Sequence, residues 1–163
     1  MERPASRRPL LVLAGVVLLI AGATLPFVLR DGDGRLSKRE YEHEVRSAYG
    51  KVQAAFQRTR GSPDSALADR VGEAQEALRD AADKLDGERP PLQVAPEHRR
   101  LVEGMREYAD DLDELRAAAE RGDERAVATF NDRTGTNAAI RKIAEAAEEM
   151  KFEGYDLGPI AED

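Results

Sequence analysis

The sequence predicts an all-α protein in which an N-terminal transmembrane helix precedes an up-down bundle of three or four antiparallel helices. Three observations support this prediction. An uncharged apolar run occupies residues 10–29. After it, apolar residues recur at intervals of three and four, the spacing that places them on one face of a helix. Mostly short connections separate these stretches, and short connections make consecutive helices antiparallel neighbours.

The apolar run at residues 10–29 has the length of a membrane span. A helix of that length measures about 30 Å, the thickness of the hydrocarbon core of a bilayer. Arg3, Arg7 and Arg8 precede the run, and a positively charged flank stays in the cytoplasm. We therefore expect a single pass through the cell membrane, with residues 1–9 in the cytoplasm and the rest of the chain outside it.

A cleaved signal peptide is the alternative for the same segment. A basic start, an apolar stretch and Ala21-Gly22-Ala23, which resembles an A-x-A cleavage site, are all present. Cleavage near Ala23 would release a secreted domain. Apolar sequence resumes at residues 25–29 and completes the span, which favours the uncleaved anchor.

Composition limits the functions open to the remainder of the chain. The net charge is −7, and residues 1–29 carry +2, which leaves −9 on the remainder. Nucleic-acid phosphates and anionic lipids repel such a domain, so we expect neither a nucleic-acid binder nor a peripheral lipid binder. The chain has no cysteine, which excludes disulfides, thiol catalysis, thiolate metal sites and the acylated cysteine of a bacterial lipoprotein.

Capping signals divide residues 37–151 into four helical stretches, which follow a linker at residues 30–36. The first stretch begins at Ser37 with Glu40 three residues later, the pattern of a capping box. A proline pair is expected to keep the long connection at residues 87–95 stiff and extended. The remaining boundaries are expected at Gly61 and Ser62-Pro63, at Gly87 and Pro96, and at Gly122 and Asp123.

The apolar face of each stretch is the expected core. The fourth stretch is less regular, because the polar residues 131–137 interrupt it either as a helix break or as a polar layer that sets the register. The tail at residues 152–163 is too apolar to be free and is expected to fold back onto the bundle. The expected core residues are Tyr41, Val45, Ala48, Tyr49, Val52, Ala55, Phe56, Leu67, Val71, Ala74, Leu78, Ala81, Leu85, Leu101, Met105, Tyr108, Leu112, Leu115, Ala119, Val127, Phe130, Ile140, Ile143, Ala147 and Met150, with Phe152, Tyr155, Leu157 and Ile160 from the tail.

The segment from Pro90-Pro91 through His98 to Leu115 joins a proline pair to a His-x-x-Leu helix start. In this respect it resembles uncharacterised secreted or membrane-anchored helical proteins of high-GC Gram-positive bacteria. The likeness covers about one sixth of the chain. It implies an extracytoplasmic helical domain of a bacterial protein, and it implies no activity and no functional residue.

The clearest local motif precedes the first helical stretch and resembles the calcium-binding loop of an EF-hand. Asp31, Asp33, Ser37 and Glu40 match the third, fifth, ninth and twelfth positions of that loop, which supply oxygen ligands. The first position is Leu29 where an aspartate is usual, and the entering helix would be the membrane span. The alternative interpretation is a flexible Gly-Asp linker followed by a helix cap.

Other candidate residues each have a structural explanation. Glu40 and His43 have the spacing of one half of a carboxylate-bridged di-iron site, but such a site needs two of these motifs on the core face. His98 is expected to hydrogen-bond a neighbouring carbonyl and fix the proline-rich loop rather than act as a ligand or base. A stripe of carboxylates is expected to form a solvated helix face beside arginines from adjacent helices. The stripe consists of Glu103, Glu107, Asp110 and Glu114, flanked by Asp111 and Asp113.

These observations predict a single-pass membrane protein whose extracytoplasmic bundle is a non-enzymatic interaction or accessory domain, with a protein partner and no cofactor. The sequence contains no Gly-rich phosphate loop, nucleophile elbow or serine triad. The alternative is an extracytoplasmic sensor or binding domain for a small ligand or calcium. A dry alanine–leucine core favours the interaction domain, whereas an inward-facing polar cluster in a sizeable cavity favours the sensor.

Overall fold

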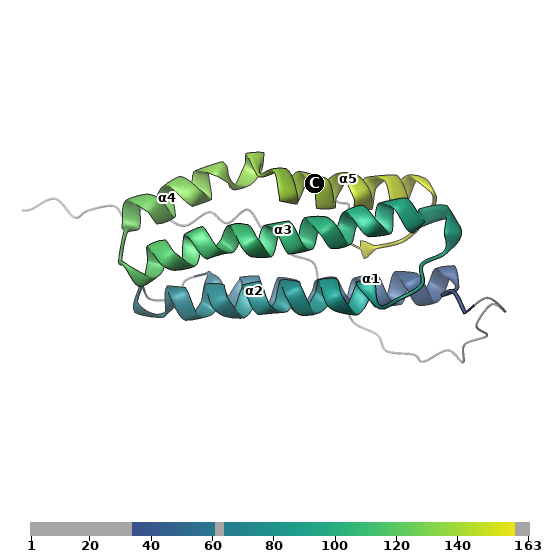
Figure 1. Ribbon diagram of the computed structural model, residues 1–163, viewed down its shortest axis with the longest axis horizontal. Helices are drawn as coiled ribbons and strands as arrows, with labels where there is room; N and C mark the ends of the chain where they lie inside the picture. The colour runs from purple at the N-terminus through teal and green to yellow at the C-terminus, as the bar shows by residue number, and fades with distance from the viewer. Residues whose placement is uncertain (1–33, 61–63, 159–163) are drawn as a thin grey trace, which may run out of the picture.

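The computed structural model describes residues 34–60 and 64–158, and all the regular secondary structure in this part of the chain is helical (Figure 1). This confirms the all-α prediction for the described residues. The predicted transmembrane helix at residues 10–29 lies outside them, and no described helix is long and apolar enough to cross a membrane. The elements are α1 (Lys38–Thr59), α2 (Asp64–Asp86), the 3-10 turn η1 (Leu92–Val94), α3 (Ala95–Glu120), α4 (Glu124–Arg133), the 3-10 turn η2 (Thr134–Thr136) and α5 (Ala138–Phe152).

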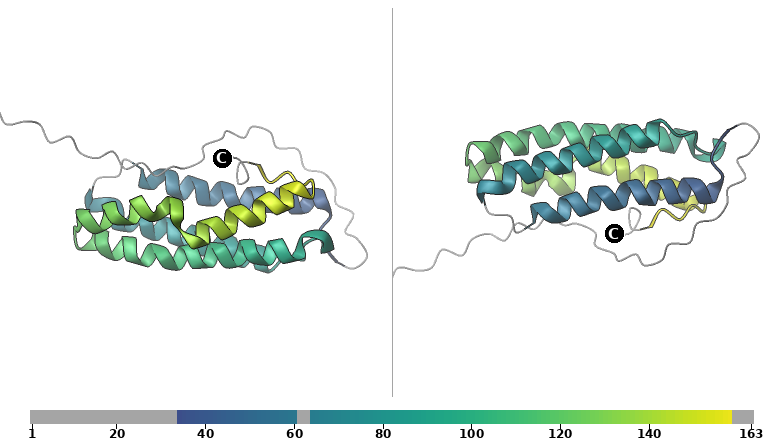
Figure 2. Two further views of the ribbon diagram at one scale, coloured as in Figure 1. Left: turned by 90° about the horizontal axis from the view of Figure 1, so that it is seen from above. Right: turned by 90° about the horizontal axis from the view of Figure 1, so that it is seen from below.

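The helices lie side by side as an elongated bundle (Figures 1 and 2). Helix α2 packs against both α1 and α3, and α3 packs against α5 along one half of its length and against α4 along the other. Helices α4 and α5 follow one another along the bundle, so together they form its fourth column. Helices α1 and α3 therefore begin at the same end of the bundle, and α2 and α5 end there.

The helix boundaries follow from side chains that cap exposed backbone groups. The Ser37 hydroxyl accepts a hydrogen bond from the Glu40 N–H at 3.4 Å, and the Glu40 carboxylate accepts one from the Ser37 N–H at 2.7 Å. The predicted capping box is therefore confirmed. The Asp123 carboxylate accepts from the Ala126 N–H and caps α4 as predicted. The predicted cap at residues 62–63 lies outside the described residues.

The fourth column is broken where the sequence predicted an interruption. The Asn137 amide oxygen accepts hydrogen bonds from the N–H groups of Ala139 and Ile140, at 2.8 and 3.1 Å, and so starts a new helix. The Asn137 backbone is extended, which ends η2. The polar segment is thus a helix break rather than a register-setting layer in the core.

The core consists mainly of alanine, leucine and valine side chains, and this lets the helices approach closely. At Gly104 in α3, an added Cβ atom would lie only 2.8 Å from Cγ1 of Ile143 and 3.2 Å from the carbonyl oxygen of Ala139, both in α5. Five of the expected core residues are only partly buried: Tyr49, Phe56, Ala119, Ile140 and Ile143.

The ends of the bundle differ from the predictions in two details. The proline pair does not keep the whole 87–95 connection extended, because Leu92–Val94 forms a 3-10 turn that leads directly into α3. In the tail, Tyr155 and Leu157 are buried and the Asp156 N–H donates to the Glu42 carboxylate at 3.0 Å. Phe152, the last residue of α5, is predicted to join them but is 90 % exposed. Ile160, the other apolar residue expected to fold back, lies outside the described residues.

The last residues of the predicted linker belong to the folded domain. Leu36 is buried, and its N–H donates to the carbonyl of Arg89 at 2.8 Å. The Arg35 guanidinium donates to the carbonyl of Pro90 at 3.0 Å. The chain is therefore fastened to the connection between α2 and α3 before α1 begins.

Candidate functional site

A buried polar cluster, formed by Tyr41, His98, Met150 and the carbonyl of Leu85, joins four helices at the end where α1 begins. The hydroxyl of Tyr41 lies 3.1 Å from Nδ1 of His98 and 3.4 Å from the sulfur of Met150. His98 also makes a hydrogen bond to the backbone of Leu85, near the end of α2. The ring of Tyr155 from the tail packs edge-on against Tyr41, with centroids 5.8 Å apart.

The carbonyl of Leu85 decides which nitrogen of His98 carries the proton. A carbonyl can only accept, so the ring nitrogen that faces it must carry a hydrogen. In the neutral ring the other nitrogen, Nδ1, is then an acceptor, and the Tyr41 hydroxyl donates to it rather than to the weaker acceptor at Met150. Both nitrogens of His98 are therefore satisfied inside the core.

Burial controls the protonation of this cluster. It lowers the pKa of His98 below its ordinary value, and the hydrogen bond to Leu85 and the charge of Asp86 offset only part of that effect. Burial likewise raises the pKa of Tyr41, assisted by Tyr155 and Glu97. Both side chains are thus neutral near pH 7. His98 is only 6 % exposed, so the cluster fastens helices together and does not present a base to solvent.

As predicted, His98 makes a hydrogen bond to a carbonyl. This carbonyl belongs to Leu85, one residue before the end of α2, and not to the proline-rich loop. The sequence prediction missed Tyr41 as its second partner. Both residues are the fourth of their helices. In an up-down bundle the first and third helices begin at the same end, and this is the signal that could have paired them.

The candidate calcium ligands are only partly described. Asp31 and Asp33 lie outside the described residues. Ser37 and Glu40 are both engaged in the capping box, so a calcium ion would have to compete with that cap for the carboxylate. His43 is exposed on α1, and within residues 34–60 and 64–158 no group of three or more metal-binding side chains comes together.

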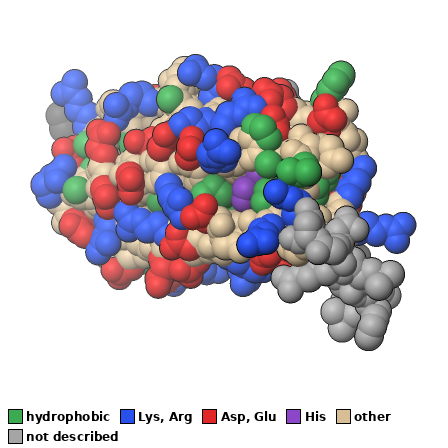
Figure 3. Space-filling model, turned by 45° about the vertical axis from the view of Figure 1, so that its right-hand side comes forward, with side chains coloured by type: hydrophobic (Ala, Val, Ile, Leu, Met, Phe, Trp, Pro, Cys, Tyr) green, Lys and Arg blue, Asp and Glu red, His purple; other side chains and the backbone are tan. Residues whose placement is uncertain are grey.

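The acidic stripe of α3 is largely matched by basic or amide groups from its neighbours. Asp110 pairs with Arg79 of α2 at 3.1 Å. Glu114 pairs with Arg133 of α4 at 2.8 Å. The further partners are Lys142 for Glu107, Asn137 for Asp111, and Gln75 for Asp113. The expected solvated face beside neighbouring arginines is present, and Figure 3 shows charges of both signs interspersed across the surface.

Gln75 is a buried polar residue that the sequence analysis did not single out. Its side-chain nitrogen donates to the carbonyl of Ala109 at 2.8 Å and to the Asp113 carboxylate at 2.6 Å, which ties α2 to α3. Gln75 is next to the core residue Ala74 in the sequence, and its position offers no other signal of burial.

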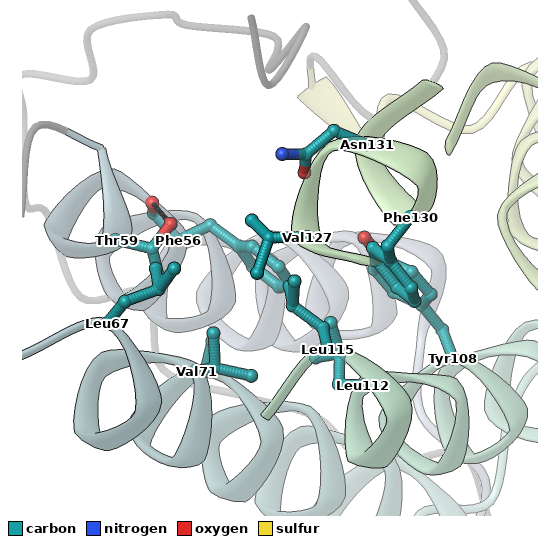
Figure 4. Close-up of a pocket in the computed structure, with 11 residues that line it drawn as sticks. Phe56, Thr59, Leu67, Val71, Tyr108, Leu112, Leu115, Val127, Phe130 and Asn131 are labelled. Carbon is teal, nitrogen blue, oxygen red and sulfur yellow. Dashed lines mark hydrogen bonds between the residues drawn. The ribbon is translucent and has the colours of Figure 1, made fainter. Parts of the chain in front are cut away.

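A small apolar cavity lies in the other half of the bundle, where α1, α2, α3 and α4 meet (Figure 4). Its volume is about 10 Å³, close to the minimum that one water molecule needs. Phe56 and Tyr108 stack beside it with centroids 5.8 Å apart. The amide oxygen of Asn131 lies at its edge, buried and without a hydrogen-bond partner among the described residues. The cavity is too small for a ligand of metabolite size.

Comparisons of the chain with protein-family models, with curated proteins and with solved structures found no match.

Proposed function

We propose that this protein is a single-pass membrane protein whose helical bundle acts outside the cytoplasm as a non-enzymatic interaction or accessory module. The apolar run at residues 10–29, behind three arginines, supports the anchor and its orientation. The helical bundle is the proposed interaction module. Its partner is expected to be another protein, because the acidic charge of the domain disfavours nucleic acid.

The observation that carries the proposal for the module is the apolar core of the described residues. Their buried side chains are mostly alanine, leucine and valine, and the apolar cavity where α1, α2, α3 and α4 meet has a volume of about 10 Å³. A sensor of small molecules needs a cavity of several hundred Å³ with converging polar groups. The buried polar cluster around His98 is satisfied internally, so it supports a structural role rather than ligand binding.

Topology is tested on the full chain in intact bacterial cells. We expect added protease to remove the bundle and carbonate washing to leave the chain in the membrane. Permeabilised cells, in which cytoplasmic proteins are also cut, provide the control for protease access. A mature protein that begins at Thr24 and is found free in the medium would show that the segment is a cleaved signal peptide instead.

The interaction role is tested by crosslinking in the same cells. We expect the full chain to capture a specific extracytoplasmic protein. A chain that keeps residues 1–33 but lacks the bundle identifies crosslinks that depend on the span alone. If both chains capture the same proteins, the bundle is not the interaction module.

A further inference from the structure

Two large apolar side chains are exposed in the described part of the chain, and both lie at the same end of the bundle. Leu92 is 65 % exposed and Phe152 is 90 % exposed. Leu92 begins η1, just after the two carbonyl groups that bind Arg35 and Leu36. Phe152 ends α5, two residues after Met150 contacts Tyr41 in the first turn of α1. This end, on the right in Figure 1, is where α1 begins. We call it the entry end.

The proposed anchor holds the entry end close to the bilayer. If residues 10–29 span the hydrocarbon core, five Cα–Cα steps separate residue 29 from Gly34, the first described residue. A fully extended chain covers at most about 3.6 Å per step, or about 18 Å in all. The headgroup layer on each side of the core is roughly 5–8 Å thick. Gly34, at the entry end, therefore lies within about 10–13 Å of the headgroup surface, whatever path the chain takes.

We propose that the entry end docks on the outer surface of the bilayer, with Leu92 and Phe152 inserted at the boundary between headgroups and acyl chains. This inference rests on the proposed membrane anchor. The long axis of the bundle then points away from the membrane, and the C-terminal ends of α1 and α3 face outward. The partner of this surface is the phospholipid bilayer itself.

Apolar insertion, rather than charge, drives this contact. The domain is acidic overall, so anionic lipid does not attract it. At the same end, α1 begins with the exposed basic residues Lys38 and Arg39, and Lys38 lies over the ring of Tyr155, with Nζ 5.1 Å from its centroid. The exposed acidic residues Asp86 and Glu153 lie at this end as well. Long basic side chains bury their methylene groups at an interface while the charge stays in water. Figure 3, in which this end comes forward, shows apolar side chains beside both basic and acidic ones on the part of this end that is visible.

Two side chains give a weak contact by themselves, and the anchor compensates for this weakness. A short tether makes the binding intramolecular, with an effective concentration on the order of millimolar. A second copy of the chain is a poorer occupant. A stable protein interface buries about 800 Å² on each partner, whereas a buried aromatic side chain contributes roughly 150–250 Å².

The test uses fluorescence of the full chain reconstituted into vesicles. The chain contains no tryptophan, so Phe152→Trp introduces a single reporter at the entry end. The vesicles are made of phosphatidylcholine, with or without phosphatidylcholine brominated near the top of its acyl chains. The matched control is Arg121→Trp, at the exposed end of α3 on the far side of the bundle. Carbonate washing of the same vesicles reports separately whether the chain is anchored.

We expect the tryptophan at position 152 to emit at shorter wavelength and to be quenched severalfold more by brominated lipid than the tryptophan at position 121. Adding Leu92→Ser to Phe152→Trp should reduce this quenching.

Carbonate-resistant chains in which neither tryptophan is quenched would overturn the docking while leaving the anchor intact. Equal quenching of both would mean that the bundle lies flat, which also contradicts the proposal. A blue shift without lipid quenching that grows with protein density would identify a second copy as the occupant. Chains that carbonate removes would refute the anchor and the docking together.

Discussion

At the scale of single residues, the least expected feature is a histidine in the core of a domain made mostly of alanine and leucine. Burying a polar ring is unfavourable unless each of its polar atoms has a partner. His98 meets this condition through Tyr41 on one side and the backbone of Leu85 on the other. The result is a directional link between helices that alanine and leucine contacts cannot supply, because apolar packing is not directional.

This arrangement predicts that acid destabilises the protein through His98. Burial lowers the pKa of His98 below its ordinary value of 6.5. The unfolded chain therefore binds this proton at higher pH than the folded chain does, and protonation favours unfolding. The contribution to stability is complete above about pH 6.5 and declines as the pH falls toward the pKa of the folded state. Urea unfolding at about pH 7.5 and about pH 5 measures the loss.

Variants of the two histidines separate this effect from the titration of other groups. His98→Gln keeps an N–H donor and an acceptor but does not titrate, so the loss of stability between these pH values should shrink. His43 is exposed on α1 and lies outside the buried cluster, so His43→Gln should leave the loss unchanged. If His98→Gln and His43→Gln behave alike, His98 does not control the acid response.

At the scale of helices, the distance between α3 and α5 depends on a glycine. The Cβ atom of an alanine at position 104 would meet Ile143 at 2.8 Å and the backbone oxygen of Ala139 at 3.2 Å. The backbone atom cannot move without shifting α5. We therefore expect Gly104→Ala to destabilise the protein by about 1–3 kcal/mol, the usual effect of overpacking. Circular dichroism during urea unfolding measures it.

Gly50 provides the matched control for this substitution. It is an exposed residue inside α1, and nothing lies within 4 Å of the position that a Cβ atom would take. Gly50→Ala should stabilise the protein by roughly 0.5–1 kcal/mol, because alanine favours the helix over the unfolded chain. If Gly104→Ala is also stabilising, α3 and α5 do not pack as closely as the structure indicates.

Leucines on the core faces of α2 and α3 test the interface between those helices. Leu78 and Leu112 are both almost fully buried. We expect Leu78→Ala and Leu112→Ala each to cost about 2–5 kcal/mol in the free energy of unfolding. Leu112 lines the existing cavity, so its removal should leave the larger void and the larger loss. Unchanged melting temperatures for both variants would refute this assignment of the core.

Periodicity and caps were enough to predict most of the helices. The apolar spacing of α2 and α3 identified their buried faces, and Ser37, Glu40 and Asp123 marked two helix starts by chemistry that acts within one turn. Features that depend on distant contacts were not predictable in the same way. The exposure of Phe152 depends on how α5 sits on α3, and the burial of Gln75 depends on acceptors 34 and 38 residues away.

At the scale of the whole molecule, the path from the proposed anchor into the bundle is short and is fastened at its end. Leu36 and Arg35 bind the connection between α2 and α3 before α1 begins. A force on the N-terminal segment therefore acts on the connection between α2 and α3 as well as on the start of α1. The predicted boundary between linker and bundle at residue 37 divides a unit that the structure holds together.

This connection predicts different stabilities for two fragments. A fragment of residues 34–163 keeps Leu36 and the cap at Ser37, and it should unfold cooperatively with strong helical circular dichroism. A fragment of residues 38–163 loses both. Burial of a leucine contributes about 1.5–3 kcal/mol and an N-cap about 1 kcal/mol, so the shorter fragment should be less stable by about 2.5–4 kcal/mol. Urea unfolding of the two fragments under identical conditions measures the difference.

Leu36→Ala in the longer fragment removes the buried leucine side chain but keeps the cap at Ser37, and it should account for the larger share of the loss. Equal stability of all three proteins would mean that residues 34–37 are a passive linker and that the bundle begins at α1.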